Sequence, residues 1–306
     1  MKHYSRNSSP MSKTPFGWLL VTKHSNEYKK RRLIEEAERA AIDLRVVTPD
    51  QFLLQSTSSK NVIRDIQTGT PIEELPTFVI SLVVVEEKDP QAFVLMEHLA
   101  ALDLLLINNP TSVRHANDKM ATYRTAAKMQ IRIPTTFLHI PGTLLTLQEH
   151  IQYPCVIKPN KGLKGTGVEL VQNVEDLTTH LNTVSEPTLV QEAIAESSGK
   201  DVRVLMLGNK PLGSMLRESN TSFTSNIATG GSAKMTTINP SYVDIATALL
   251  KKMTITFGSV DFLYGKDEMV LCEVNANPGL KMFEAVSNRN IAKEILLYCT
   301  KQSHTS

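Results

Sequence analysis

The sequence predicts an α/β fold that becomes α+β in its C-terminal part. In the first third, apolar strand-like runs alternate with amphipathic helical segments, a pattern typical of a parallel sheet covered by helices. In the last third, pairs of strand-like runs are joined by short turns, which favours antiparallel hairpins. The chain has 306 residues, of which 41% are hydrophobic and 21% charged, and it is long enough for about two globular domains.

The elements of the first third alternate as a parallel sheet requires. The run at 16–22 (FGWLLVT) predicts a buried strand, and Ser25 is the candidate N-cap of the next helix, at 27–41. That helix places Leu33 and Ala37 on one face and charged residues on the other. The remaining elements expected here are strands at 44–47, 78–85 and 104–107 and a helix at 91–102.

After a turn-rich segment at 108–111, hairpin signals replace this alternation. Asp118 is the expected N-cap of a helix at 118–129. The later elements expected are strands at 135–140, 154–158, 167–172 and 188–194, helices at 174–184, 241–254 and 291–300, and hairpins made of 201–207 with 212–217 and of 258–264 with 269–275. At the other end, the basic, serine-rich stretch 1–14 is expected to be a disordered leader.

Composition and charge exclude several classes of protein. The 33 Lys and Arg residues against 31 Asp and Glu residues leave a net charge of +2, so no nucleic-acid or membrane partner is expected. The longest apolar stretch, 79–85, is far shorter than the roughly 18 residues of a membrane span. Cys155, Cys272 and Cys299 are far apart and form no Cys-x-x-Cys pair, which argues against a disulfide scaffold. We therefore expect a cytoplasmic protein.

The strongest chemical signal lies near the C-terminus, in a hairpin that ends in the sequence EVNANPG. Residues two apart on a strand share a face, so Glu273 and Asn275 point the same way, and the hairpin brings Asp261 beside them. Two carboxylates and an amide oxygen form an all-oxygen set that suits Mg²⁺. The alternative is an edge hairpin with its polar residues in solvent, but the apolar strand around them favours a buried site.

A second signal is a lysine followed by a glycine-rich loop. Lys158 ends the apolar run PCVI, and Gly162, Gly165 and Gly167 follow it. Glycines let backbone N–H groups approach phosphate oxygens closely, and lysines add positive charge. The pattern is neither a Walker A loop nor the G-x-G-x-x-G motif. Taken alone, it fits either an anion-binding loop or a glycine-rich hairpin turn.

A third signal is the strand-like segment LVQEAI at 189–194. A strand that runs into a linker presents alternate backbone N–H and C=O groups, which could contact the edge of an adenine ring. Glu192 could reach a ribose hydroxyl or the adenine amine. Asp201 and Arg203 share a strand face just behind this segment, and a structural pair between them is the alternative to a role in the site.

Taken in order along the chain, these segments resemble the ATP-grasp superfamily, and within it the carboxylate–amine ligases of the RimK (ribosomal-protein glutamate ligase) type. The resemblance covers roughly residues 70–300 and implies three domains, with ATP between the last two. These are an N-terminal α/β pre-ATP-grasp domain (15–112), a central lid domain (113–190) and a C-terminal ATP-grasp domain (191–306). The matching segments are 117–120, 158–167, 191–192, 201–203, Arg217, 225–226, 230–231, Asp261 and 273–279.

The resemblance implies a role for each of these positions. The nucleotide-binding residues would be Lys119, Lys158, Gly162, Gly165, Thr166, Gly167, Gln191, Glu192, Ala193, Ile194 and Asp201. The catalytic residues, which face the transferred phosphate and the substrates, would be Arg203, Arg217 and Asn226. The metal ligands would be Asp261, Glu273 and Asn275.

The resemblance also implies an ATP- and Mg²⁺-dependent ligase, with two Mg²⁺ ions and with Mn²⁺ as a substitute. Transfer of the ATP γ-phosphoryl group to a carboxylate would give an acylphosphate, and attack by an amine would then form an amide and release phosphate. An amino acid such as glutamate is the expected amine, and the acid is a small molecule, a peptide or a protein C-terminus. A homo-oligomer, either dimer or tetramer, is also typical of the family.

Two other functions stay open. Leu163 and Ala193 stand where the family often has a serine and an aromatic residue, and segment 83–89 stands where relatives often carry a Pro-Arg element. These departures leave room for an ATP-binding regulatory or scaffold protein that has lost ligase activity. The other function that stays open is that of a phosphotransferase, which would use the same site to phosphorylate a hydroxyl group.

Overall fold

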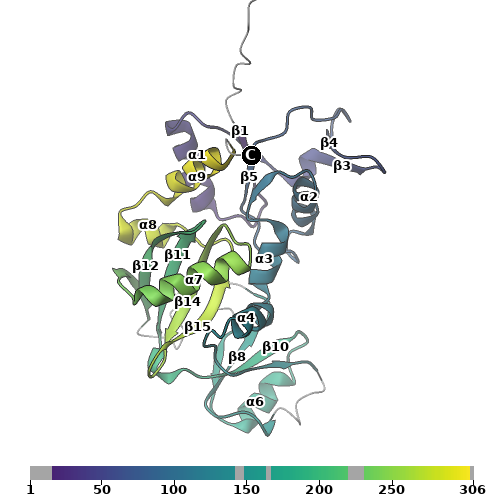
Figure 1. The fold of residues 1–306 in the computed structure, drawn as a ribbon. Coiled ribbons are helices and arrows are strands. Elements are labelled where there is room, and N and C mark those ends of the chain that lie inside the picture. Colours follow the sequence, from purple (N-terminus) through teal and green to yellow (C-terminus); the bar gives the residue numbers. More distant parts are fainter. Residues whose placement is uncertain (1–15, 142–147, 163–166, 220–230, 304–306) are drawn as a thin grey trace, which may run out of the picture.

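The computed structural model describes residues 16–141, 148–162, 167–219 and 231–303 (Figure 1). Three main sheets follow one another along the chain, with strand orders β2-β1-β5-β6, β7-β10-β8-β9 and β13-β12-β11-β14-β15. The first sheet is parallel, and the other two are antiparallel. The predicted α/β fold with an α+β C-terminal part is confirmed. The leader predicted at 1–14 lies outside the described residues.

The N-terminal sheet is built as the alternation predicts. Its strands are β1 (Phe16–Leu20), β2 (Asp43–Val47), β5 (Phe78–Ser81) and β6 (Leu105–Ile107), and its predicted helices are α1 (Glu27–Arg39) and α2 (Pro90–Ala100). Helix α3 (Pro110–Asn117) was not predicted and begins within the segment that was expected to be a turn. The N-cap of α1 is Asn26, whose side chain accepts from the backbone N–H of Lys29, so the expectation of Ser25 was wrong by one residue. The strand expected at 78–85 ends at Ser81.

A short hairpin that the sequence analysis did not predict lies between β2 and β5. It consists of the 3₁₀ turn η1 (Pro49–Gln51), β3 (Phe52–Ser56) and β4 (Asn61–Asp65). The ring of Phe52 stacks on Trp18 with 4.9 Å between their centroids. The hairpin therefore extends the cover of the N-terminal sheet, although most of its residues are only half-buried.

The central region has its own small core. The region consists of α4 (Lys119–Lys128), β7 (Thr136–His139), β8 (Cys155–Pro159), β9 (Glu169–Val171), α6 (Val174–Leu181) and β10 (Thr188–Glu192). Side chains of β8, β9, β10 and α6 form a hydrophobic cluster separate from the two larger ones. The predicted limit between residues 190 and 191 lies within β10, and the domain limits stay predictions. We refer to the sheet β7-β10-β8-β9 with α6 as the lid.

The C-terminal sheet provides a long antiparallel platform. Its strands are β11 (Lys200–Leu207), β12 (Lys210–Glu218), β13 (Ser232–Thr236), β14 (Phe257–Tyr264) and β15 (Met269–Asn275). The same region also contains η2 (Ala195–Ser197), α7 (Pro240–Lys252), α8 (Lys281–Ser287) and α9 (Ile291–Ser303). Both predicted hairpins are confirmed. Helix α9 returns to the N-terminal sheet and lies beside α1 (Figure 1). Among the described helices, none has the length and apolar character that a bilayer span requires.

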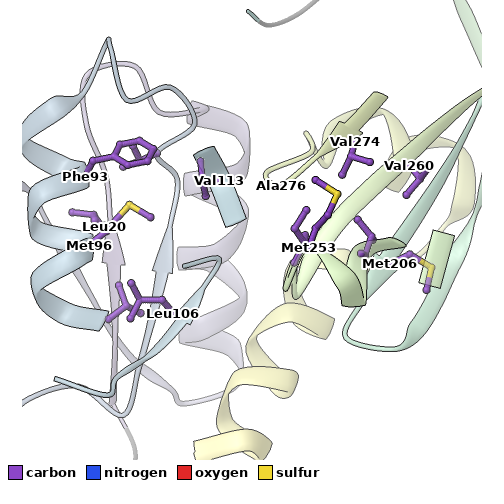
Figure 2. Packing of buried hydrophobic residues seen from close by; sticks show 14 of the residues in the cluster. Leu20, Phe93, Met96, Leu106, Val113, Met206, Met253, Val260, Val274 and Ala276 are labelled. Atoms are coloured by element: carbon purple, nitrogen blue, oxygen red, sulfur yellow. The ribbon is translucent and has the colours of Figure 1, made fainter. Parts of the chain in front are cut away.

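Two hydrophobic clusters each join the N-terminal and C-terminal sheets. Figure 2 shows part of the first, in which Leu20 and Phe93 belong to the N-terminal region and Val260 and Val274 to the C-terminal sheet. Helix α3 contributes Val113 to this cluster. The second cluster contains side chains of α1, β11 and α9. The two outer regions therefore share their cores.

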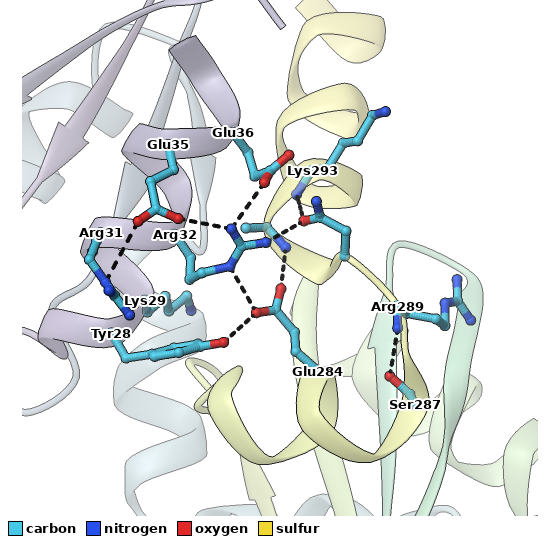
Figure 3. A network of polar contacts seen from close by, with 12 residues as sticks. Tyr28, Lys29, Arg31, Arg32, Glu35, Glu36, Glu284, Ser287, Arg289 and Lys293 are labelled. Carbon is cyan, nitrogen blue, oxygen red and sulfur yellow. Dashed lines mark hydrogen bonds and ion pairs between the residues drawn. The ribbon is translucent and has the colours of Figure 1, made fainter. Parts of the chain in front are cut away.

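Polar contacts reinforce this junction (Figure 3). The guanidinium group of Arg32 in α1 donates to Glu36, to Glu284 in α8 and to Asn290. The hydroxyl of Tyr28 donates to the Glu284 carboxylate at 2.9 Å. Because these partners are only partly exposed, the network fixes the angle between α1 and α8 more firmly than a surface ion pair would.

Asn108 is a second polar link, at the end of β6. Its side-chain oxygen accepts from the backbone N–H groups of Thr256, at 2.7 Å, and Phe257, at 3.0 Å. Its amide nitrogen donates to the backbone carbonyls of Phe257 and Ala276. Asn108 is only 3% exposed, so one side chain satisfies buried backbone groups at one end of β14 and just beyond β15.

We predict that Asn108→Ala destabilises the protein by about 2–4 kcal/mol, because it leaves several buried backbone groups without partners. Urea denaturation followed by circular dichroism measures this loss. The control is Asn209→Ala, at an exposed turn residue, which is expected to change the free energy of unfolding by no more than about 0.5 kcal/mol. Equal stability of the two variants would contradict the proposed role of Asn108.

Candidate active site

Strand register gathers six polar side chains on one face of the C-terminal sheet. Asp261 in β14 lies opposite both Glu273 in β15 and Arg203 in β11. Further along the sheet, Asp201 in β11 lies opposite Arg217 in β12. Directly opposed residues of antiparallel strands share a face. Asn275, two residues after Glu273, completes the set, and its side-chain nitrogen donates to the Glu273 carboxylate at 3.1 Å.

Asp261 is the centre of this face. Arg203 donates to its two carboxylate oxygens, from Nε at 2.8 Å and from Nη2 at 2.6 Å. Arg217 Nη2 donates to Oδ2 at 2.7 Å. The side chain of Asp261 is 0% exposed. Burial alone would raise the pKa of this carboxyl group, but the two guanidinium groups outweigh burial and hold the pKa below its usual value.

The remaining ion pairs follow the same register. Arg217 donates to both oxygens of Asp201, at 2.7 and 2.5 Å. From the sequence, Arg203 was considered as a structural partner of Asp201. In the structure Arg203 instead binds Asp261, because opposed residues on neighbouring strands are closer together than residues two apart on one strand. Arg203 Nη2 also lies 3.8 Å from the Glu273 carboxylate. The arginines thus connect all three acidic residues.

The three predicted metal ligands, Asp261, Glu273 and Asn275, lie close together, and two arginine side chains lie beside them. The described part of the chain holds no cluster of three His, Cys, Asp or Glu side chains suited to a metal. An ion here would depend on Asp261, Glu273 and the amide oxygen of Asn275. A carboxylate has about four lone-pair sites, and the three N–H donors leave about one of them on Asp261 Oδ1. This oxygen set fits Mg²⁺, which completes its coordination with water and phosphate.

Lys158 approaches this face from the lid. Its ammonium group donates to the hydroxyl of Tyr123 at 2.9 Å, and that hydroxyl donates to the backbone carbonyl of Cys272 at 2.6 Å. Burial acts to lower the pKa of Lys158, but Tyr123, Cys272 and Glu273 act in the opposite direction, so the pKa lies above its usual value. Lys158 is therefore a buried cation directly beside the strand that carries Glu273.

Lys119 occupies the first turn of α4, at the edge of the same space. Its ammonium group donates to the backbone carbonyls of Pro159, at 3.2 Å, and Gly162, at 3.4 Å. Burial lowers the pKa of Lys119, the charge of Glu273 opposes this effect, and the charge of Lys158 adds to it. Within the described residues, no carboxylate lies within 4 Å of either ammonium group. Neither positive charge is therefore neutralised by an ion pair with a described residue, and a site that binds phosphate needs such cations.

The glycine loop is described only at its two ends. Gly162 and Gly167 have φ angles of +151° and +72°. A side chain at Gly167 would also lie 3.2 Å from the ring of Pro159, so both geometry and space favour glycine there. Gly165 and Thr166 lie outside the described residues, as do Leu163, Asn226 and Gly230.

The segment predicted to contact adenine joins β10 to η2. The Gln191 side chain is buried and donates to Thr136 Oγ1 at 2.7 Å. The Glu192 carboxylate accepts from the backbone N–H of Thr135, at 2.9 Å, and from Arg132, at 3.1 Å. These two contacts lower the pKa of Glu192 against the opposing effect of burial. Ile194 is buried, and Ala193 is half-exposed.

Sequence reasoning missed two residues that shape this site. Asn160 accepts from the backbone N–H of Met120 at 2.9 Å and donates to Asp118 at 3.2 Å, so it joins the lid loop to the start of α4. Tyr123 lies in α4 one turn after Lys119, on the side of the helix that faces Lys158 and Cys272. The one available signal was the spacing of Lys119 and Tyr123, since residues four apart share a helix face.

A model of the RimK-like ATP-grasp domain matches residues 116–299, which is more than half of the chain. The chain belongs to this family. The resemblance inferred from the sequence is therefore confirmed, and this RimK-like chain belongs with the enzymes of the ATP-grasp carboxylate–amine ligase class.

Two curated relatives of this RimK-like chain are each named probable alpha-L-glutamate ligase. The protein from Mannheimia succiniciproducens is 28% identical over 294 residues, covering 93% of this chain and 98% of the relative. The protein from Rhodopirellula baltica is 27% identical over 283 residues, covering 90% of this chain and 68% of the relative.

Solved structures share the RimK-like fold at low sequence identity. A RimK domain ATP-grasp protein from Sphaerobacter thermophilus has a TM-score of 0.67 and 18% identity, covering 92% of this chain and 98% of its own. The ATP-grasp ligase PsnB, complexed with a variant of its minimal precursor, Mg and ADP, has a TM-score of 0.73 and 13% identity, covering 95% and 99%. The D-alanine–D-alanine ligase of Bacillus anthracis, complexed with ATP, has a TM-score of 0.68 and 14% identity, covering 95% and 97%.

We predict that Asp261→Asn destabilises the RimK-like fold by about 3–5 kcal/mol at pH 7, because Arg203 and Arg217, both largely buried, lose the carboxylate charge that they share. Since the folded-state pKa of Asp261 is lowered, its contribution is fully present above the unfolded value and is lost as the pH falls through the folded value. When the pH falls below about 4, the wild type should therefore lose more stability than the variant, and the difference between the two should become smaller.

Urea denaturation at pH 7, 4 and 3 measures both effects. Asp267→Asn is the matched control, because this exposed carboxylate lies in the turn between the same two strands. If the asparagine variant at 261 were as stable as this control at pH 7, the ion network would not have the structural role that its geometry indicates.

Proposed function

We propose that this chain uses ATP and Mg²⁺ to join a carboxylate to an amino compound through an acylphosphate. The observation that carries the proposal is the meeting of two groups of side chains, one from α4 and the lid and the other from the C-terminal sheet. Lys119 and Lys158, neither of which has a carboxylate within 4 Å among the described residues, lie on one side, and Asp261, Glu273 and Asn275 lie on the other. Cations that face an oxygen-ligand set form the arrangement that a metal-bound nucleoside triphosphate requires.

The chemistry follows from the charges that such a site must manage. A carboxylate is a poor acyl donor, and transfer of the γ-phosphoryl group to it turns its oxygen into part of a good leaving group, phosphate. Lys119, Lys158 and the arginines would bind and orient the phosphate oxygens, and bound Mg²⁺ would neutralise charge on the transferred group. The amine nitrogen then attacks the acyl carbon, loses a proton, and displaces phosphate to form the amide.

Arg203 and Arg217 are proposed to face the reacting groups, each while held by a carboxylate. Arg203 is anchored by Asp261, and Arg217 by Asp201 and Asp261. Anchored guanidinium groups stabilise developing negative charge without the cost of reorganising during the reaction. A nucleophilic thiol is not part of this scheme, since burial raises the pKa of Cys272, next to Glu273, to about 12.

For the substrates, we propose an amino acid such as glutamate as the amine and a peptide, a protein C-terminus or a small acid as the carboxylate. The names of the curated relatives support glutamate. PsnB and the macrocyclase MdnC of Microcystis aeruginosa, which were solved with precursor peptides, support a peptide as one substrate. A dimer or tetramer and a cytoplasmic location stay predictions, and the three cysteines are free, as a reducing compartment would require.

One observation favours a second function, that of an ATP-binding regulatory protein without ligase activity. The Asp261 carboxylate already accepts three N–H bonds and is fully buried, so its access to a metal depends on the remaining lone pair. Tight binding of ATP without turnover across pools of acids and amines would support this function over ligation.

We predict that the purified chain forms acyl-hydroxamates when it is supplied with ATP, Mg²⁺, hydroxylamine and an accepted carboxylate. Lys158→Ala and Glu273→Gln should each reduce kcat/KM by at least about 100-fold, because each removes a charge that stabilises phosphoryl transfer. The ferric-hydroxamate colour reaction and ADP release measure the two products.

Matched controls are Lys266→Ala and Glu268→Gln, which change the same residue types at exposed positions in the turn before β15. Both should keep wild-type rates. Full activity in the Glu273 variant would refute the assignment of Glu273 as a metal ligand.

We also predict that treatment with EDTA abolishes ADP release and that Mg²⁺ restores it, with partial recovery in Mn²⁺, because both ions favour oxygen ligands. Coupled detection of ADP measures recovery, and Ca²⁺ serves as the comparison ion, because it prefers longer bonds and a larger coordination number. Unchanged turnover in EDTA would show that the oxygen set does not bind an essential ion.

A further inference from the structure

Tyr123 lies at the junction of the lid, helix α4 and the C-terminal sheet. Its side chain is 2% exposed and belongs to the large hydrophobic cluster shared by the N-terminal and C-terminal regions. Its hydroxyl donates to the backbone carbonyl of Cys272 at 2.6 Å and accepts from Lys158 Nζ at 2.9 Å. The side chain of Gln191 also faces this hydroxyl.

The direction of these two hydrogen bonds is fixed by chemistry. A backbone carbonyl can only accept, so the phenolic proton points at Cys272. An ammonium group can only donate, so Lys158 binds a lone pair of the same oxygen. Burial raises the pKa of Tyr123, which keeps the phenol protonated. The hydroxyl therefore links the cation of one sheet to the backbone of another.

A neutral partner suits a lysine that must bind phosphate. A carboxylate at this place would neutralise the ammonium group, whereas a hydroxyl restricts its position and leaves its charge available. Lys158 has three N–H donors, and the contact with Tyr123 uses one of them. Because Tyr123 is also bound to Cys272, the position of the ammonium group is set relative to the neighbouring residue, Glu273.

We propose that Tyr123 is a positioning residue for nucleotide binding: its hydroxyl holds the Lys158 ammonium group at a fixed place beside the strand that carries Glu273. This inference rests on the proposed function, since it assumes that Lys158 binds nucleotide phosphate. Tyr123 itself is not a catalytic residue in this scheme, because it acts through Lys158.

The chain offers a close control for the loss of a buried phenolic hydroxyl. Tyr153 precedes β8, packs against the small core of the lid, and carries a buried hydroxyl that has no hydrogen-bond partner among the described residues. Tyr123→Phe and Tyr153→Phe both keep the aromatic ring, so they preserve most of the packing. They differ in whether the deleted hydroxyl contacts Lys158.

The test is a double-mutant cycle on nucleotide affinity, measured by calorimetry with Mg²⁺ and the non-hydrolysable β,γ-imido analogue of ATP. Tyr123→Phe should weaken binding about tenfold, as expected for loss of a hydrogen bond to a charged group. Tyr153→Phe should stay within about twofold of wild type. In the Lys158→Ala background, Tyr123→Phe should weaken binding by less than about twofold further, because its effect passes through Lys158.

Two results would overturn the inference: unchanged affinity in Tyr123→Phe, or the same loss of affinity with and without Lys158. The second would assign Tyr123 a general structural role. Thermal melting of each variant checks that the protein is folded in every arm. Failure of the wild-type chain to bind the analogue at all would instead overturn the proposed function, so the two failures are distinguishable.

Discussion

The candidate active site depends on the buried carboxylate of Asp261. It accepts hydrogen bonds from Arg203 and Arg217, which belong to two different strands, and it stands opposite Glu273 on a third. In a medium of low polarity, unpaired charges are costly, so each guanidinium group stays where its carboxylate partner lies. The orientation of both arginines is thereby set by the protein itself. Such preorganisation lets a site stabilise charge that develops during a reaction.

The parts of the site that were predictable from sequence follow from local geometry. The two-residue period of a strand and one short hairpin suffice to bring Asp261, Glu273 and Asn275 together. The arginine contacts were less accessible, because β11 lies between β12 and β14, and this order of strands is a property of the whole sheet. Tyr123 was missed for a similar reason: its position in α4 says nothing about which strands the helix packs against.

The same division applies to the fold. Strongly apolar strands such as β5 and clear amphipathic helices such as α1 were predictable because their patterns are long and regular. The hairpin β3–β4 was missed, since its strands are half-buried and alternate weakly. Helix α8 was also missed: it has seven residues and begins after Leu280, which provides no side-chain cap. Short elements are stabilised mainly by tertiary contacts, which local sequence does not record.

The hydrogen bonds of Asn108 indicate which residues a fragment must contain in order to fold. The region that defines the family starts at residue 116, yet the strand that bears Asp261 is capped by a side chain from further upstream. Helix α9 likewise packs its apolar face on α1, near the N-terminus. A fragment cut to the family limits would expose this apolar surface and leave the backbone N–H groups of Thr256 and Phe257, where β14 begins, without their acceptor. The smallest autonomous version of this enzyme therefore includes its N-terminal sheet.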